Sequence, residues 1–118
     1  MIDLSEKRKF PRVDVRVPLQ YKELHGSAKS AKGSLTKNVS AGGVKLQTDK
    51  FISMACRLVV EMNIPTGSKP IKAISKVAWI KKLPFGDNYE VGNQFLDMTK
   101  DDKKAITNYV EETEKSPS

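Results

Sequence analysis

Apolar and polar residues alternate one by one through much of this chain, and this period of two constrains its fold more than any other feature. Successive side chains of a β-strand point to opposite faces, so strict alternation predicts a strand with one buried face. The clearest example is residues 13–21, whose apolar positions are Val13, Val15, Val17, Leu19 and Tyr21. Pro18 cannot donate a hydrogen bond to a neighbouring strand and is expected at an edge or a bulge.

Similar strand patterns recur along the chain, separated by turns. The further strand-like segments are residues 35–39, 44–48, 56–64, 71–80 and 89–95. Loops or turns are predicted where Gly, Pro, Ser and Asn cluster, at residues 22–33, 42–43, 65–70 and 83–88. Several short strands joined by turns predict a small antiparallel barrel or sandwich.

After residue 98 the period becomes that of a helix. Thr99 is a candidate N-cap, and Asp101 and Asp102 fall in the first turn, where the helix dipole favours anions. The apolar residues at helical spacing are Ala105, Ile106, Tyr109 and Val110. This stripe is narrow, so we expect a C-terminal helix that docks on the β body and is not stable alone.

Composition limits the classes of protein that fit. The 118 residues are 38% apolar and 30% charged, enough for one domain with a modest core. No segment is long and apolar enough for a membrane span, and the N-terminus lacks a secretory signal pattern. The single cysteine, Cys56, excludes an intramolecular disulfide and fits a reducing cytosol, so a cytoplasmic location is expected. Cys56 itself is expected to be a small buried residue in a strand.

The net charge is +7, from 21 Lys and Arg against 14 Asp and Glu. This excess favours anionic partners, although a solvated basic surface would give the same composition. The chain has one His and one Cys, which give neither a metal cluster nor a Cys/His nucleophile arrangement. Neither an enzyme nor a bound cofactor is therefore expected.

Two short motifs go beyond composition. The first is Arg8-Lys9-Phe10-Pro11-Arg12, with two arginines four positions apart in a basic segment that shows no periodicity. The second is Asn38-Val39-Ser40-Ala41-Gly42-Gly43, between two strand-like segments. Taken singly, the first could be a solvated basic tail and the second an ordinary loop leading into a turn.

Together and in this order, the two motifs resemble the RxxxR and [D/N]xSxxG elements of the PilZ domain, a bacterial family that binds cyclic di-GMP. The resemblance covers essentially the whole chain. It implies an all-β fold with a C-terminal helix, specifically a six-stranded antiparallel β-barrel. The expected organisation is a flexible basic arm over residues 1–12, the barrel over 13–98, and the helix and tail over 99–118.

The resemblance also implies the ligand and its site. Cyclic di-GMP offers guanine edges, guanine faces and two phosphates. An arginine fork can pair with phosphate oxygens or with guanine O6 and N7, and its plane can stack on a purine. Asn and Ser supply short donors and acceptors, and glycine allows positive φ and close approach of a base. The site residues implied are Arg8, Arg12, Asn38, Ser40 and Gly43, with Lys7, Lys9 and Gly42 as weaker candidates.

The expected function is that of a stand-alone cyclic di-GMP receptor. Ligand binding would order the N-terminal arm and change the surface seen by an unidentified downstream protein. Lys7 leaves open whether one or two ligands bind, and the process that is controlled and the oligomeric state are also open. Trp79 alternates with Val77 and is expected in the core, not in a ligand stack.

Two alternatives remain at this level. A small basic β-barrel can bind single-stranded nucleic acid, but such modules usually place several aromatic residues on an exposed face. Only 7% of this chain is aromatic. The other alternative is a PilZ-like protein-interaction module that binds no ligand, which the presence of both motifs argues against.

Overall fold

The structure is a computed structural model that describes residues 11–25, 31–66 and 69–115. Lys7, and Arg8 and Lys9 of the first motif, lie outside these residues. The described elements are β1 (Arg12–Val13), β2 (Pro18–Glu23), β3 (Lys32–Ser40), β4 (Gly43–Thr48), β5 (Arg57–Met62), β6 (Ile71–Lys82), β7 (Tyr89–Met98) and α1 (Lys100–Lys115).

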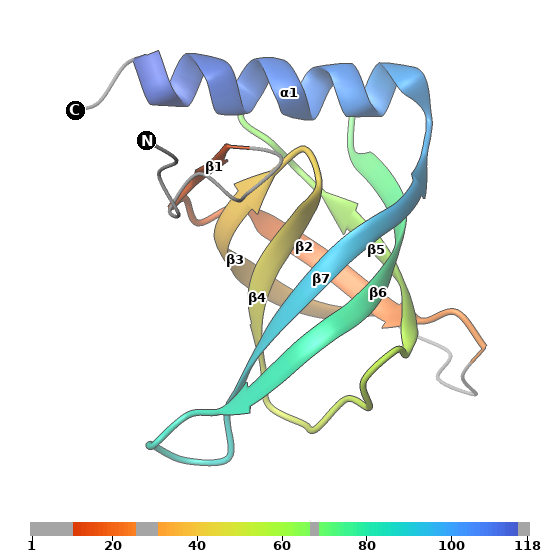
Figure 1. Ribbon diagram of the computed structural model, residues 1–118, viewed down its shortest axis with the longest axis vertical. Coiled ribbons are helices and arrows are strands. Elements are labelled where there is room, and N and C mark those ends of the chain that lie inside the picture. The colour runs from red at the N-terminus through yellow and green to blue at the C-terminus, as the bar shows by residue number, and fades with distance from the viewer. Residues whose placement is uncertain (1–10, 26–30, 67–68, 116–118) are drawn as a thin grey trace, which may run out of the picture.

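Six of the strands close into an antiparallel barrel. Their order is β3-β2-β5-β6-β7-β4, and the pairing of β3 with β4 completes the circle. The short strand β1 pairs with the end of β3 beyond β2, with Arg12 opposite Ser40. These pairings confirm the predicted fold class, a six-stranded antiparallel barrel followed by one helix (Figure 1).

The barrel interior is filled by residues whose side chains the alternating pattern predicted to face inward. Val17 on the approach to β2, Leu46 on β4, Leu58 and Val60 on β5 and Val91 on β7 are at most 1% exposed. Burying a side chain of this size stabilises the fold by about 1.5 to 3 kcal/mol. The alternating pattern therefore fixes which face of each strand lies in the core.

Bulges interrupt the alternation in two of the strand pairs. The register between β3 and β4 shifts at Lys37, and the register between β6 and β7 shifts at Ala78. An extra residue in one strand turns the following side chains to the other face. Beyond Ala78, Ile80 packs against the core, whereas Trp79 is 38% exposed. The prediction that Trp79 belongs to the core is therefore wrong.

The helix α1 lies across one open end of the barrel (Figure 1). The Thr99 hydroxyl accepts a hydrogen bond from the backbone N–H of Asp102 at 3.1 Å, which confirms the predicted N-cap. Ile106, Tyr109 and Val110 are buried, and the helix contacts β1, β3 and β6. The expected docking of this helix on the β body is confirmed. Within the described residues, no helix is long and apolar enough to cross a membrane.

Candidate ligand-binding site

An open groove of about 360 Å³ on the barrel wall brings residues of both sequence motifs together. We call it the motif groove. Its lining residues come from β1, β3, β4, β6 and β7 and from the turn between β3 and β4: Arg12, Asn38, Ser40, Gly42, Gly43, Val44, Lys45, Ala78, Trp79, Gly92, Asn93 and Gln94. Segments far apart in sequence meet here because β1 and β4 both pair with β3.

Arg12 is placed at the groove by backbone pairing. It belongs to β1 and not to the arm to which the sequence prediction assigned it, and it lies opposite Ser40 of β3. The residue is exposed, and no carboxylate of the described residues forms an ion pair with it. Its guanidinium is thus available for a ligand at the edge of the groove.

Asn38 and Ser40 both line the groove but differ in what their side chains do. Asn38 is 7% exposed, and its amide makes no hydrogen bond with a described residue. The Ser40 hydroxyl accepts hydrogen bonds from the backbone N–H groups of Gly42 and Gly43, each at 3.1 Å, and donates to the Gly43 carbonyl at 3.3 Å. Among the described residues the Asn38 amide has no hydrogen-bond partner, whereas the Ser40 hydroxyl holds the turn that shapes the groove.

Gly43 is required by packing between strands. A Cβ at this position would lie 2.1 Å from the backbone oxygen of Asn93 on β7. Gly86 is the only glycine of the described residues with positive φ. Gly43 therefore does not use the positive φ that glycine permits, and the close approach of β4 to β7 explains why this residue is glycine.

Trp79 lines the groove, although the sequence predicted it in the core. Its indole packs over Gly92, where a Cβ would lie 2.3 Å from the indole nitrogen. Glycine at 92 therefore makes room for the ring, which lines the groove and is partly exposed. Only the bulge at Ala78 turns this residue outward, and alternation in the sequence does not reveal a bulge. The single usable signal was Gly92 itself, a small residue inside a strand.

A cluster of charges borders the motif groove. The Glu90 carboxylate pairs with Lys37 Nζ at 3.4 Å and with Lys45 Nζ at 3.5 Å. Lys45 Nζ also lies 5.9 Å from the centre of the Trp79 ring, within the range of a cation–π contact. Sequence reasoning named neither lysine, because their proximity depends on the pairing of β3 and β4 with each other and of β4 with β7.

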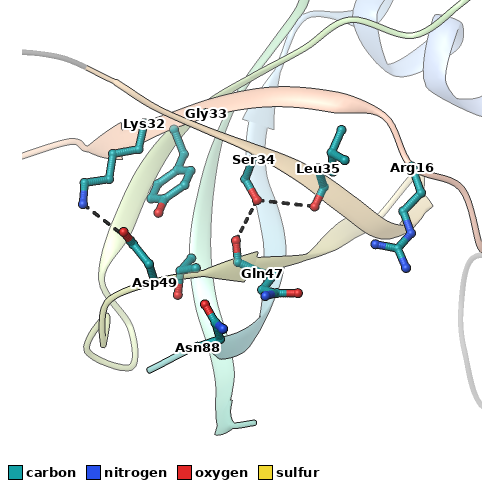
Figure 2. Close-up of a pocket in the computed structure, with 10 residues that line it drawn as sticks. Arg16, Lys32, Gly33, Ser34, Leu35, Gln47, Asp49 and Asn88 are labelled. Atoms are coloured by element: carbon teal, nitrogen blue, oxygen red, sulfur yellow. Dashed lines mark hydrogen bonds and ion pairs between the residues drawn. The ribbon is translucent and has the colours of Figure 1, made fainter. Parts of the chain in front are cut away.

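A larger cavity, of about 760 Å³, opens where β3 and β4 diverge (Figure 2). Its walls include Arg16, Ser34, Gln47 and Asn88, and the Lys32–Asp49 ion pair of 3.6 Å crosses one end. None of the predicted site residues lines it. Size alone would favour this cavity, but the convergence of both motifs favours the smaller motif groove as the ligand site.

Cys56 is one of the described residues whose pKa lies clearly away from its ordinary value. It precedes β5, is partly exposed, and donates a hydrogen bond from its thiol to Glu23 Oε1 at 3.2 Å. Burial, with that hydrogen bond and the negative charge of Glu23, raises the pKa of the thiol to about 11. The expectation of a buried apolar cysteine inside a strand is therefore wrong.

No group of three or more potential metal ligands occurs among the described residues.

Comparison with known families gives an independent view of this fold. The family model of the PilZ domain matches residues 6–112 of the chain. The chain belongs to the PilZ domain family. The match includes both sequence motifs, the whole barrel and most of α1.

Solved structures of PilZ proteins share this architecture. The Bacillus subtilis inhibitor of motility (MotI/DgrA) superposes with a TM-score of 0.80 and 17% identity, over 92% of this chain and 52% of that one. The PilZ domain of YcgR from Escherichia coli, solved with c-di-GMP, gives 0.70 and 16% identity over 93% of each chain. A MrkH–c-di-GMP complex from K. pneumonia gives 0.71 and 17% identity, over 96% of this chain and 55% of that one.

These identities establish a shared PilZ fold and nothing finer. This chain spans about half the length of MotI and of MrkH. A comparison with curated protein sequences gives no match.

Proposed function

We propose that this PilZ chain is a receptor for cyclic di-GMP and binds it in the motif groove. The observation that carries the proposal is the meeting of Arg12, Asn38 and Trp79 around one open groove. A fork of donors, an amide and an aromatic ring match the three kinds of surface that the ligand presents: phosphate, guanine edge and guanine face.

Each residue has a distinct role in this proposal. Arg12 pairs with a phosphate or with guanine O6 and N7, and Arg8 from the preceding segment makes the second such contact. Asn38 reads a guanine edge, with Ser40 and Gly43 holding the turn beside it. Trp79 supplies a stacking face. Lys7, Lys9 and Gly42 have supporting roles, the lysines by adding positive charge.

The ligand signal would be transmitted by a conformational change and not by a catalysed reaction. Binding orders the segment before Arg12 over the barrel, and the altered surface is recognised by a downstream protein. Two of the similar structures contain c-di-GMP, and a third is an inhibitor of motility, which supports a receptor role over an enzymatic one. We place this activity in the cytoplasm, consistent with the lone cysteine.

Calorimetric titration with cyclic di-GMP tests the proposal directly. We expect saturable binding that is much tighter than binding of GMP, GTP or a random-sequence oligonucleotide. A guanine mononucleotide offers only half of the contacts, and an oligonucleotide needs a longer row of aromatic residues. If the oligonucleotide bound as tightly as cyclic di-GMP at moderate salt, the chain would be a nucleic-acid-binding barrel instead.

A further inference from the structure

We propose that Lys45 is an additional cationic contact for the ligand's phosphates, held beside the motif groove by Glu90 and transferred from Glu90 to the ligand on binding. This inference rests on the proposed function, because it concerns the same groove. It goes beyond the two sequence motifs, since Lys45 lies two positions after the last motif residue and belongs to neither.

The first support is an excess of positive charge. Glu90 is shared by two lysines, so the cluster of Lys37, Glu90 and Lys45 carries one net positive charge. The side chains are 27%, 26% and 16% exposed for Lys37, Lys45 and Glu90. Partial burial weakens screening by salt, so the unbalanced charge acts strongly on an anion that enters the groove.

The second support is position. Lys45 lies on β4 between the buried residues Val44 and Leu46, so its side chain points outward, and it lines the motif groove. Its partner in the cluster, Lys37, sits at the bulge of β3 and is not among the groove residues. Of the two lysines on Glu90, only Lys45 therefore faces the groove.

The third support is that the exchange leaves no partly buried charge without a partner. When Lys45 turns to a phosphate, Glu90 keeps its ion pair with Lys37 at 3.4 Å. A carboxylate left without a partner at 16% exposure would otherwise oppose the movement. Because Lys37 keeps Glu90 paired, the free-energy cost of moving Lys45 to the ligand is small.

The same movement would take the Lys45 ammonium group away from the face of the Trp79 ring. Lys45 Nζ lies over the Trp79 ring at 5.9 Å from its centre. A base that stacks on this face needs the ammonium group to move aside. One rotation of the Lys45 side chain therefore delivers a cation to the phosphates and opens the ring to a guanine.

The test compares Lys45→Met with a matched variant, Lys32→Met, by calorimetry with cyclic di-GMP at low and high salt. Lys32 also belongs to a surface ion pair, with Asp49 at 3.6 Å, but it lines the other cavity (Figure 2). Both variants lower the net charge equally. We expect Lys45→Met to weaken binding about tenfold or more at low salt and to reduce its salt dependence, and Lys32→Met to stay within about twofold of wild type.

Further variants separate a direct contact from a structural effect. Lys45→Arg keeps the cation and should retain most of the affinity. Glu90→Gln releases Lys45 and should bind at least as tightly as wild type, whereas Lys45→Met with Glu90→Gln should bind as weakly as Lys45→Met alone. If Lys45→Met destabilises the barrel, Lys45→Gln replaces it in the comparison.

The outcomes distinguish this inference from the function on which it rests. Equal affinities of the Lys45→Met and Lys32→Met proteins would overturn the role of Lys45 while leaving the receptor intact. Absence of cyclic di-GMP binding by the wild-type chain would instead overturn the proposed function.

Discussion

At the scale of single residues, Arg12 is the motif cation that the described structure brings to the groove. It is exposed, lies opposite Ser40 and has no ion pair with a described residue. Nothing in the described fold competes for its guanidinium. Its effect on a ligand should therefore depend on the geometry of the fork and not only on its charge.

Replacing Arg12 by lysine tests that dependence. Arg12→Lys keeps the net charge of +7 but removes the planar fork. We expect cyclic di-GMP affinity to fall by about 1 to 3 kcal/mol, the usual range for a lost bidentate contact to a base. Calorimetry measures the loss, with thermal melting as a check on folding and Lys9→Ala as the comparison. Similar small losses in both proteins would mean that the segment acts only as diffuse charge.

A second residue-scale prediction concerns Cys56. Its thiol pKa is raised to about 11 from an ordinary 9.0, so at pH 8 the folded protein holds about a hundredfold less thiolate than an ordinary cysteine. Alkylation by iodoacetamide should be correspondingly slow, and should accelerate as the pH rises toward 11. Glu23→Gln removes the negative charge and should speed the reaction at pH 8. Mass spectrometry gives the rates, with urea-unfolded protein as the reference; equal rates for folded and unfolded chains would contradict the assignment.

At the scale of elements, the contact between β4 and β7 sets the shape of the motif groove. Gly43 on β4 and Gly92 on β7 both lie there, and each is glycine for a different reason. Gly43 allows two backbones to approach, whereas Gly92 leaves room for the Trp79 ring. Changes at the two positions should therefore have different consequences.

Gly43→Ala should destabilise the barrel. The new methyl group would meet the backbone oxygen of Asn93 at 2.1 Å, and a paired strand cannot move away easily. The expected cost is about 1 to 3 kcal/mol in the free energy of unfolding. Gly33→Ala is the matched control, because a Cβ there meets nothing within 4 Å. Urea denaturation of the two variants decides the matter, and equal stability would show that β4 can shift.

The sequence predicts most of the elements but not all of the site, because neither bulges nor the pairing of distant strands is visible in it. Alternation reports burial of one strand face, so it located most of the strands and most of the core. The predicted single strand over residues 13–21 is wrong, because β1 ends at Val13 and β2 begins at Pro18. It fails where an extra residue changes the face, as at Ala78, and so it misplaced Trp79. Lys45 and Glu90 were missed because their proximity follows from pairing between distant segments.

At the scale of the whole molecule, the proposed switch links the N-terminal segment to the barrel through β1. Arg12 and Val13 already pair with β3. Ligand that engages both Arg8 and Arg12 would extend this order toward the N-terminus. The helix α1 contacts β1 as well, so a change in β1 can reach that end of the barrel.

Amide hydrogen exchange with and without cyclic di-GMP tests this link. The sequence predicts that residues 1–12 carry too little apolar surface to offset the entropy of ordering. We therefore expect the amides of residues 1–10 to exchange rapidly without ligand and to become protected with it. The barrel strands, already paired, should change little. Protection that is the same in both states would rule out a ligand-driven switch.

The position of Trp79 has one more consequence, which is spectroscopic. The chain contains a single tryptophan, and it is 38% exposed beside Gly92 in the motif groove. All indole fluorescence of the protein therefore arises at the place where the ligand is expected to bind. Guanine stacked on that ring should quench the emission, and displacement of water around it should shift the emission to shorter wavelength. The unlabelled protein thus carries its own optical sensor of occupancy, with which ligand and partner binding could be followed in real time.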